Sequence, residues 1–170
     1  MKKAQIAGQI FIYMMAVVVV GLIIAYGYSA IKSFSDKGQE VESITLRKSL
    51  ENSVKAITSD YGSIKRPDTS IPGKYEFVCF TDKARIGDAD NTAFCGAPGG
   101  DPRQYYPIAC AAWKTGRDNI FLVPDGSDSF DVGEIVIKDN QPFICLEVIN
   151  NKIKLQLEGL GDRVQVSQYS

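Results

Sequence analysis

The chain has 170 residues, with 19 Lys and Arg, 20 Asp and Glu and no histidine, so its formal charge is −1. This length allows one modest domain beside an apolar segment, and the absence of histidine removes the most frequent general base and metal ligand. Residues 67–170 hold 10 basic and 15 acidic residues, a net charge of −5, which disfavours nucleic acid as a partner.

The first predicted element is an apolar helix from Ile6 to Ile31 that contains no charged residue. Its most apolar part, residues 10–28, is about 28 Å long at about 1.5 Å per residue, close to the hydrocarbon thickness of a bilayer. A helix that is apolar on all sides belongs in lipid or inside an assembly, so we predict a membrane segment. Lys2 and Lys3 precede it and predict a cytoplasmic N-terminus and an external C-terminus. The run is too long for an ordinary cleaved signal peptide.

Beyond the membrane, the helix is predicted to continue as an amphipathic helix over residues 32–62. Apolar residues recur there at steps of three, four and seven, with charged residues between them. Gly38 is a predicted weak point, because glycine is unfavourable inside a helix. Gly62 can cap the helix, and Pro67 and Pro72 oppose a restart. We therefore expect one long helix, or two stacked segments, over residues 5–61.

After Gly73 the apolar period changes to two, which predicts an extracytoplasmic β-rich head domain over residues 73–170. Strands are expected at residues 75–80, 119–123, 132–138, 142–149, 152–157 and 163–166. The last four are predicted to form an antiparallel meander, with Asn150 and Asn151 in a tight turn. Residues 82–104 are expected to be a long loop, and residues 105–113 fit either a strand or a short helix.

The fold class predicted from these elements is α+β, with a long N-terminal helix packed on a C-terminal antiparallel sheet. Alternation places Ile144, Leu146 and Val148 on one face of their strand, and Ile153, Leu155 and Leu157 likewise share a face. Such an apolar face needs a cover. We expect the apolar stripe of the amphipathic helix to provide it.

Four cysteines, Cys79, Cys95, Cys110 and Cys145, follow the membrane segment. Their number is even, they form no CxxC motif and no histidine accompanies them, which favours two disulfides over a zinc site. Disulfides also indicate an oxidising, extracytoplasmic compartment. Of the three pairings that four cysteines allow, we favour Cys79 with Cys95 and Cys110 with Cys145.

Two acidic stretches are candidate cation sites, one around Asp88 and Asp90 and one over residues 125–131. Calcium takes six to eight oxygen ligands, and alternating aspartates resemble the start of a calcium loop. Counting from Asp88, however, the twelfth position is Gly99 rather than glutamate, and plain turns favour the same residue types. We expect no cofactor and no metal, with calcium at Asp88 and Asp90 as a weak alternative.

The sequence offers no catalytic motif. It contains no GxSxG, no P-loop and no GxGxxG, and without histidine no nucleophile–base pair stands out. Tyr105, Tyr106 and Trp113 fit core packing better than a recognition patch. We therefore expect the protein not to be an enzyme.

The N-terminal region carries a resemblance to a known family. A short leader ending Lys2-Lys3-Ala4, then Gln5-Ile6, an apolar helix continuing into an amphipathic one and a disulfide-bearing β domain resemble a type IV pilin, most closely the archaeal kind. The leader is similar to a class III signal peptide. The resemblance implies that a prepilin peptidase recognises Lys3, Ala4 and Gln5 and removes residues 1–4. The sequence departs from bacterial pilins at Gln9, where they usually carry a glutamate that pairs with a neighbour's amino terminus.

The resemblance further implies a structural subunit, a major or minor pilin or pseudopilin. Its partners would be the membrane, a prepilin peptidase, copies of itself or other pilins, and the pilus assembly machinery. Residues 5–31 would be the transmembrane and polymerisation helix of a single-pass protein that ends in a cell-surface or extracellular filament, with a role such as adhesion. The candidate helix-packing residues are Gln9 and, at four-residue spacing, Gly21, Ala25 and Ser29. The alternatives are a membrane-anchored binding or adhesion domain that never polymerises and, less favoured, a membrane-tethered enzyme.

Overall fold

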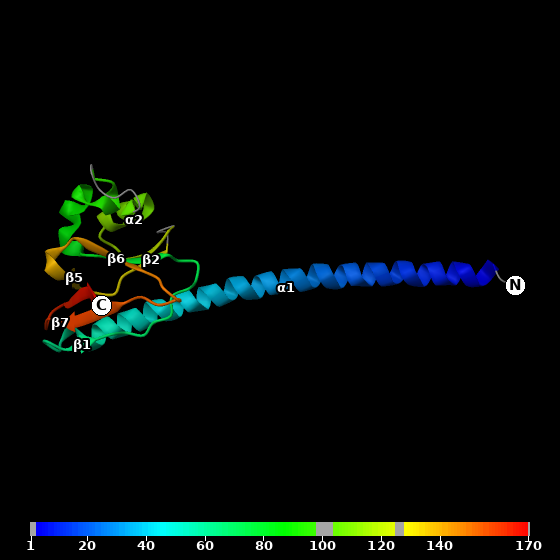
Figure 1. Ribbon diagram of the computed structural model, residues 1–170, viewed down its shortest axis with the longest axis horizontal. Helices are drawn as coiled ribbons and strands as arrows, with labels where there is room; N and C mark the ends of the chain where they lie inside the picture. The colour runs from blue at the N-terminus through cyan, green and yellow to red at the C-terminus, as the bar shows by residue number, and fades with distance from the viewer. Residues whose placement is uncertain (1–2, 98–103, 125–127, 170) are drawn as a thin grey trace. The chain divides into compact units, whose positions relative to one another are not determined.

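The computed structural model describes residues 3–97, 104–124 and 128–169, with the backbone alone described at residues 3–10, 33–37, 39 and 40. The chain divides into two compact units, Met1–Val41 and Glu42–Ser170. Helix α1 runs from Lys3 to Thr58 (Figure 1). The predicted long helix is therefore confirmed as one continuous element, and it ends shortly before Gly62, which has a positive φ of 76°.

The second unit, here called the head, contains two four-stranded sheets. Their strand orders are β1-β7-β8-β5 and β4-β3-β2-β6. The strands are β1 (Ile64–Lys65), β2 (Phe77–Thr81), β3 (Ile120–Val123), β4 (Asp128–Phe130), β5 (Ile135–Ile137), β6 (Phe143–Glu147), β7 (Leu155–Gly159) and β8 (Val164–Gln168). Every neighbouring pair is antiparallel except β5 and β8, which are parallel. The expected α+β class is confirmed, since a long N-terminal helix precedes a mostly antiparallel sheet domain.

The predicted antiparallel meander is wrong. Of its four strands only β7 and β8 form an antiparallel pair, because β6 belongs to the other sheet beside β2 and β5 runs parallel to β8. Alternation shows which side of a strand is apolar but does not select its neighbour. The predicted tight turn between β6 and β7 is confirmed locally: Asn150 and Asn151 have φ of 51° and 61°, and Ile149 bridges Lys152.

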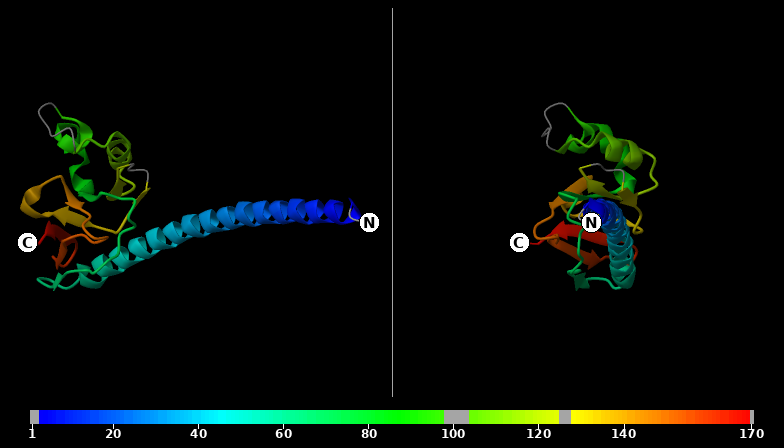
Figure 2. Two further views of the ribbon diagram at one scale, coloured as in Figure 1. Left: turned by 45° about the vertical axis from the view of Figure 1, so that its right-hand side comes forward. Right: turned by 90° about the vertical axis from the view of Figure 1, so that its right-hand side faces the viewer.

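The main core lies where both sheets meet the end of α1. Leu46, Leu50, Val54 and Ile57 form the buried stripe of the helix, and Figure 1 and Figure 2 show this part of α1 beside β1 and β7. The partners from the sheets are Val78, Phe80, Ile120, Leu122, Leu146, Leu155, Leu157, Val164 and Val166. The expected cover of the sheet by the amphipathic helix is confirmed, while Ile44 at its start remains exposed.

A second core covers the other face of the β4-β3-β2-β6 sheet. It is built by two 3₁₀ helices, η1 (Lys83–Asn91) and η2 (Ala93–Cys95), and by helix α2 (Pro107–Lys114). Residues 82–104 were expected to be a loop, so the prediction missed η1 and η2. Short 3₁₀ helices carry no extended apolar periodicity, and η1 begins instead at a local cap, where Ala84 N–H donates to the Asp82 carboxylate at 2.8 Å.

Aromatic side chains fill this second core, and the predicted core packing is confirmed for Tyr106 and Trp113 but is wrong for Tyr105, which is half exposed. Phe94 lies at its centre, with ring centroids 5.7 Å from Tyr106, 5.8 Å from Trp113 and 5.9 Å from Phe121. Trp113 is fully buried and donates its indole N–H to the Asp82 carbonyl at 3.2 Å. The head thus has two apolar layers, one on each face of the β4-β3-β2-β6 sheet.

All four cysteines form disulfides, but the favoured pairing is wrong. Cys79 is bonded to Cys145 and Cys95 to Cys110. Cys79 and Cys145 lie directly opposite each other on β2 and β6, with their Cα atoms 3.9 Å apart. Cys95 ends η2 and Cys110 lies on α2, 15 residues later. The pairing follows from a strand register between distant segments, which the spacing of the cysteines does not reveal.

The end of α1 is fixed to the end of β7 by backbone contacts. Gly62 N–H donates to the Gly159 carbonyl at 2.8 Å, and Gly159 N–H donates to the Ser63 carbonyl at 2.9 Å. A Cβ atom at Gly159 would collide with the backbone carbonyl oxygens of Ile57 and Asp60. Only glycine permits so close an approach of two backbones.

We expect Gly159→Ala to lower the free energy of unfolding by about 2 kcal/mol, because neither backbone can move without breaking the two hydrogen bonds. Chemical denaturation followed by circular dichroism measures this loss. Gly87→Ala is the matched control, since nothing lies within 4 Å of its added Cβ. Equal stability of the two variants would contradict the close packing at Gly159.

Candidate functional site

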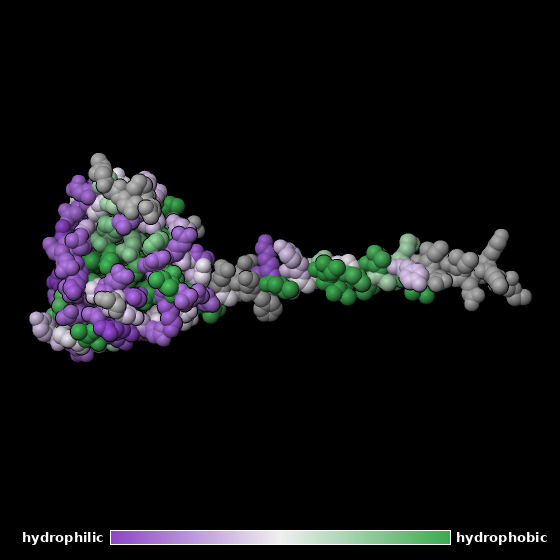
Figure 3. Space-filling view, viewed as in Figure 1, coloured by the Kyte–Doolittle hydropathy of each residue, from purple (hydrophilic) through white to green (hydrophobic). Residues whose placement is uncertain are grey.

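The most prominent candidate site is the apolar part of α1. Residues Phe11–Lys32 form one helical stretch of 22 residues, none of it buried, that is long and apolar enough to cross a membrane. Figure 3 shows the hydrophobic colour along this stretch. Its large exposed side chains are Phe11, Ile12, Tyr13, Met14, Met15, Val17, Val18, Val19, Val20, Leu22, Ile23, Ile24, Tyr26, Tyr28 and Ile31. Apolar surface on all sides of a helix requires lipid or other helices around it.

The candidate packing residues lie on this stretch. Gly21, Ala25 and Ser29 are helical and exposed, and no atom outside the local backbone lies within 4 Å of a Cβ placed on Gly21. Residues four apart share one face of a helix, so the three present a strip of low side-chain volume. This strip permits another helix to approach closely.

The residues of the predicted cleavage site are described in part. Lys3, Ala4 and Gln5 have helical backbone in α1, as does the candidate packing residue Gln9, and the side chains of all four lie outside the described residues. Residues 1 and 2 of the predicted leader also lie outside them. The cleavage site therefore stays a prediction from the sequence.

Both aspartates of the calcium hypothesis are engaged with cations of the head. Asp88 forms an ion pair with the Arg85 guanidinium at 2.6 Å, and Asp90 pairs with the Lys114 ammonium. Within residues 3–97, 104–124 and 128–169, no three His, Cys, Asp or Glu side chains gather in a way that could hold a metal. The second acidic stretch is described only from Asp128 onward, and calcium is not proposed.

A cluster of polar groups joins the start of β4 to the segment before β2. The Tyr75 hydroxyl donates to the Asp128 carboxylate, and the Lys74 ammonium lies 3.0 Å from the same oxygen. The Tyr75 hydrogen bond is the main reason why the pKa of Asp128 lies below its usual 3.8. Burial is the main reason why the pKa of Tyr75 lies above its usual 10.0. The pair is therefore most stable with Asp128 ionised and Tyr75 neutral.

Because the pKa of Asp128 is lower in the folded head, its stabilising effect is complete above about pH 4 and is lost as the pH falls through the folded value. We expect Asp128→Asn to lower the free energy of unfolding by about 1 kcal/mol at pH 7, since the carboxylate is half exposed and screened. The difference from the unmodified chain should disappear once the pH falls below the folded-state pKa of Asp128. Asp90→Asn, at a surface ion pair, should change stability by less than about 0.5 kcal/mol. A pH-independent loss for Asp128→Asn would contradict this account.

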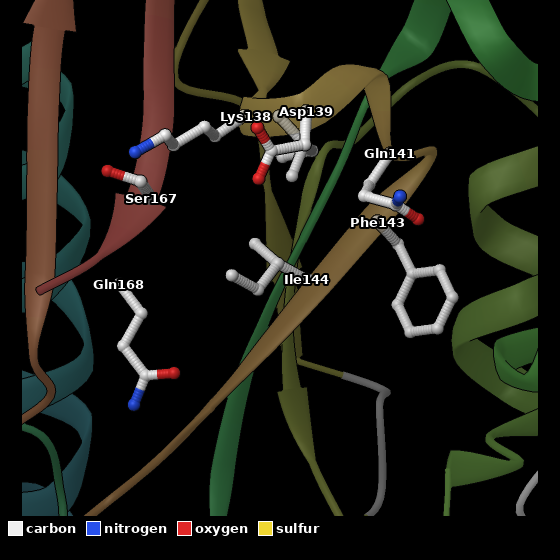
Figure 4. Close-up of a pocket in the computed structure, with 8 residues that line it drawn as sticks. Lys138, Asp139, Gln141, Phe143, Ile144, Ser167 and Gln168 are labelled. Carbon is white, nitrogen blue, oxygen red and sulfur yellow. The ribbon is translucent and has the colours of Figure 1, made fainter.

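Two hollows in the head, each lined in part by β6, were not foreseen from the sequence. One has a volume of about 280 Å³ and lies between β6 and the end of β8, with Ile144 at its centre and Lys138, Ser167 and Gln168 around it (Figure 4). The other, of about 370 Å³, is lined by Glu147 at the end of β6 and by Lys154 and Tyr169. No sequence signal marks them, because their walls come from strands of different sheets.

Comparisons with known protein families, with curated proteins and with solved structures found no match to this chain.

Proposed function

We propose that the chain is a structural subunit, a major or minor pilin or pseudopilin, of a filament resembling archaeal type IV pili, and that it assembles through its N-terminal helix. The observation that carries this proposal is the apolar stretch Phe11–Lys32, none of it buried, which belongs to one continuous helix leading into a disulfide-bonded head. A helix of this kind needs a lipid environment before assembly and other helices after it.

The apolar surface of α1 would be covered by lipid in the membrane and by neighbouring helices in the filament. In lipid, the segment would span the bilayer once with Lys2 and Lys3 in the cytoplasm, in keeping with the positive-inside rule. In a filament, the strip of Gly21, Ala25 and Ser29 would let neighbouring helices approach closely enough to bury one another. The two disulfides of the head support an external location, because disulfides persist in oxidising compartments.

The first experiment determines the N-terminus of the protein isolated from the envelope of its native host, by intact mass and N-terminal peptide. A chain beginning at Gln5 is expected if a prepilin peptidase removes the leader. A chain beginning at Met1 would overturn the filament proposal and favour a membrane-anchored monomer. A start near Ser29 would indicate a secreted protein and would overturn both.

A substitution at the cleavage site links processing to assembly. We expect Ala4→Trp to block removal of residues 1–4 and to abolish filaments seen by electron microscopy, since the class III signal peptide pattern that the leader resembles has a small residue before the cut. Ala4→Ser keeps a small residue and is the matched control. Filaments formed by uncleaved Ala4→Trp chains would contradict the proposed route.

The second candidate function is a membrane-anchored extracytoplasmic binding or adhesion domain that does not polymerise. The two hollows along β6 favour it, because they offer a recognition surface that filament assembly does not require. In that case α1 serves only as an anchor and stalk, and residues 1–4 would be retained.

A further inference from the structure

Strand β6 has an open edge. It is the last strand in the order β4-β3-β2-β6, so within the described part of the chain β2 is its one neighbour in the sheet. The hydrogen bonds that flank the pair run from Val148 N–H to the Glu76 carbonyl at 2.8 Å and from Asp82 N–H to the Pro142 carbonyl at 3.0 Å. They fix which residues of β6 face β2.

Hydrogen-bonded residues alternate along an antiparallel pair. In the register of β2 and β6, Ile144 and Leu146 therefore bond to β2, whereas the N–H and C=O groups of Phe143, Cys145 and Glu147 point to the open edge. The short 3.9 Å between the Cα atoms of Cys79 and Cys145 agrees with a pair of residues that share no backbone hydrogen bond. Three donors and three acceptors are thus aligned at the intervals of a partner strand.

The open edge borders the two hollows described above. The first has an apolar floor at Ile137 and Ile144, and in Figure 4 the Phe143 ring points away from Ser167 and Gln168, so it does not fill this space. Its volume of about 280 Å³ is enough for an apolar side chain of an added strand. The second hollow lies farther along the same strand, beside Glu147.

The second hollow has a positive charge balance. It is lined by three cations, Arg66, Lys152 and Lys154, and by two carboxylates, Asp68 and Glu147. Lys152 is paired with Asp68 at 2.8 Å. Arg66 donates to the Gln156 side-chain oxygen and lies over the Tyr169 ring, and neither contact neutralises its charge. The lining therefore has a net charge of +1, three cations against two carboxylates, which favours a carboxylate of a ligand.

We propose that the open edge of β6 binds an extended peptide segment of a partner protein, which adds as a strand beside Phe143, Cys145 and Glu147. The segment places an apolar side chain in the hollow at Ile137 and Ile144 and a carboxylate near Arg66 and Lys154. Backbone bonds to the edge supply affinity, and the two hollows select the side chains. This inference does not depend on polymerisation, since it concerns the head alone.

The test uses the full chain in lipid nanodiscs and displayed random peptides of about seven residues, the length of an ordinary strand. We expect selected peptides to carry an apolar residue and an acidic residue at a fixed spacing. On binding of such a peptide, amide hydrogen exchange should slow about tenfold at Phe143, Cys145 and Glu147 and stay unchanged at Ile144 and Leu146, which already bond to β2. Uniform protection, or none, would overturn strand addition.

Two variants separate the contribution of the backbone hydrogen bonds from that of the charge in the second hollow. Glu147→Pro removes a donor that points to the open edge without removing a bond to β2, and should weaken binding of the peptide about tenfold. Lys154→Glu, at an exposed side chain, should weaken the binding of acidic peptides by a similar factor. Lys48→Glu makes the same charge change on α1 and should leave that binding unchanged. Unchanged binding to Lys154→Glu would overturn the charge assignment. Protection of the same three amides by self-association without peptide would instead assign the edge to a second copy and overturn the proposal.

Discussion

Replacing Cys79 and Cys145 together by alanine is expected to lower the free energy of unfolding of the head by about 4 kcal/mol. The two cysteines lie 66 residues apart, so their bond restricts a long loop in the unfolded chain. It also holds β6, an edge strand, to β2 at the centre of their pairing. A loss of this size is a large fraction of the stability of an ordinary domain.

The matched control is the double alanine variant of Cys95 and Cys110. Their disulfide closes a loop of 15 residues, so its loss should lower the free energy of unfolding by about 3 kcal/mol. Urea unfolding followed by tryptophan fluorescence measures both, because Trp113 is the single tryptophan and lies buried in the second core. Loss of the Cys95–Cys110 bond should loosen this core first. A larger loss for that variant than for the Cys79 and Cys145 variant would contradict the ranking by loop length.

Replacing Val18 by arginine is expected to abolish filament formation and to release the chain from the membrane. Val18 lies within Phe11–Lys32, and 57% of its side chain is exposed to whatever surrounds the helix. An arginine at the centre of a membrane helix costs about 2.5–3.5 kcal/mol on insertion scales. In a filament the same charge would be buried among apolar helices without a partner.

Val18→Leu keeps the segment apolar and serves as the control. Fractionation of membranes after carbonate extraction measures insertion, and electron microscopy measures assembly. We expect Val18→Leu to behave like the unmodified chain in both. Filaments made of Val18→Arg subunits would show that this stretch does not lie in the apolar interior of the assembly, and the proposed route of polymerisation would fail.

Local sequence patterns predicted the helical part of the fold well. The uninterrupted apolar run and the three-to-four spacing of Leu46, Leu50, Val54 and Ile57 describe α1 without reference to any distant residue. The alternation of Leu155 and Leu157 likewise identified a half-buried strand. Each of these patterns involves residues only a few positions apart in the chain, so each can be recognised from the sequence alone.

Long-range pairing could not be predicted in the same way. Nothing near Ile144 indicates that β6 lies beside β2 rather than β7, and the disulfide pairing follows from that register. The apolar stretch of α1 could be identified as a candidate site from its composition alone, because its whole surface is apolar. The hollows beside β6 could not, since Ser167 and Gln168, for example, line the first of them only after the two sheets have formed.

The segment between β2 and β3 has ends that meet, since Thr81 N–H donates to the Asn119 carbonyl at 2.9 Å. The strands therefore do not need this segment to hold their ends together. The second core does need it, because Phe94 and Trp113 cover the face of the sheet that carries Phe121. A foreign sequence inserted on the outer surface of this segment should be tolerated if these aromatic residues and the Cys95–Cys110 bond are kept.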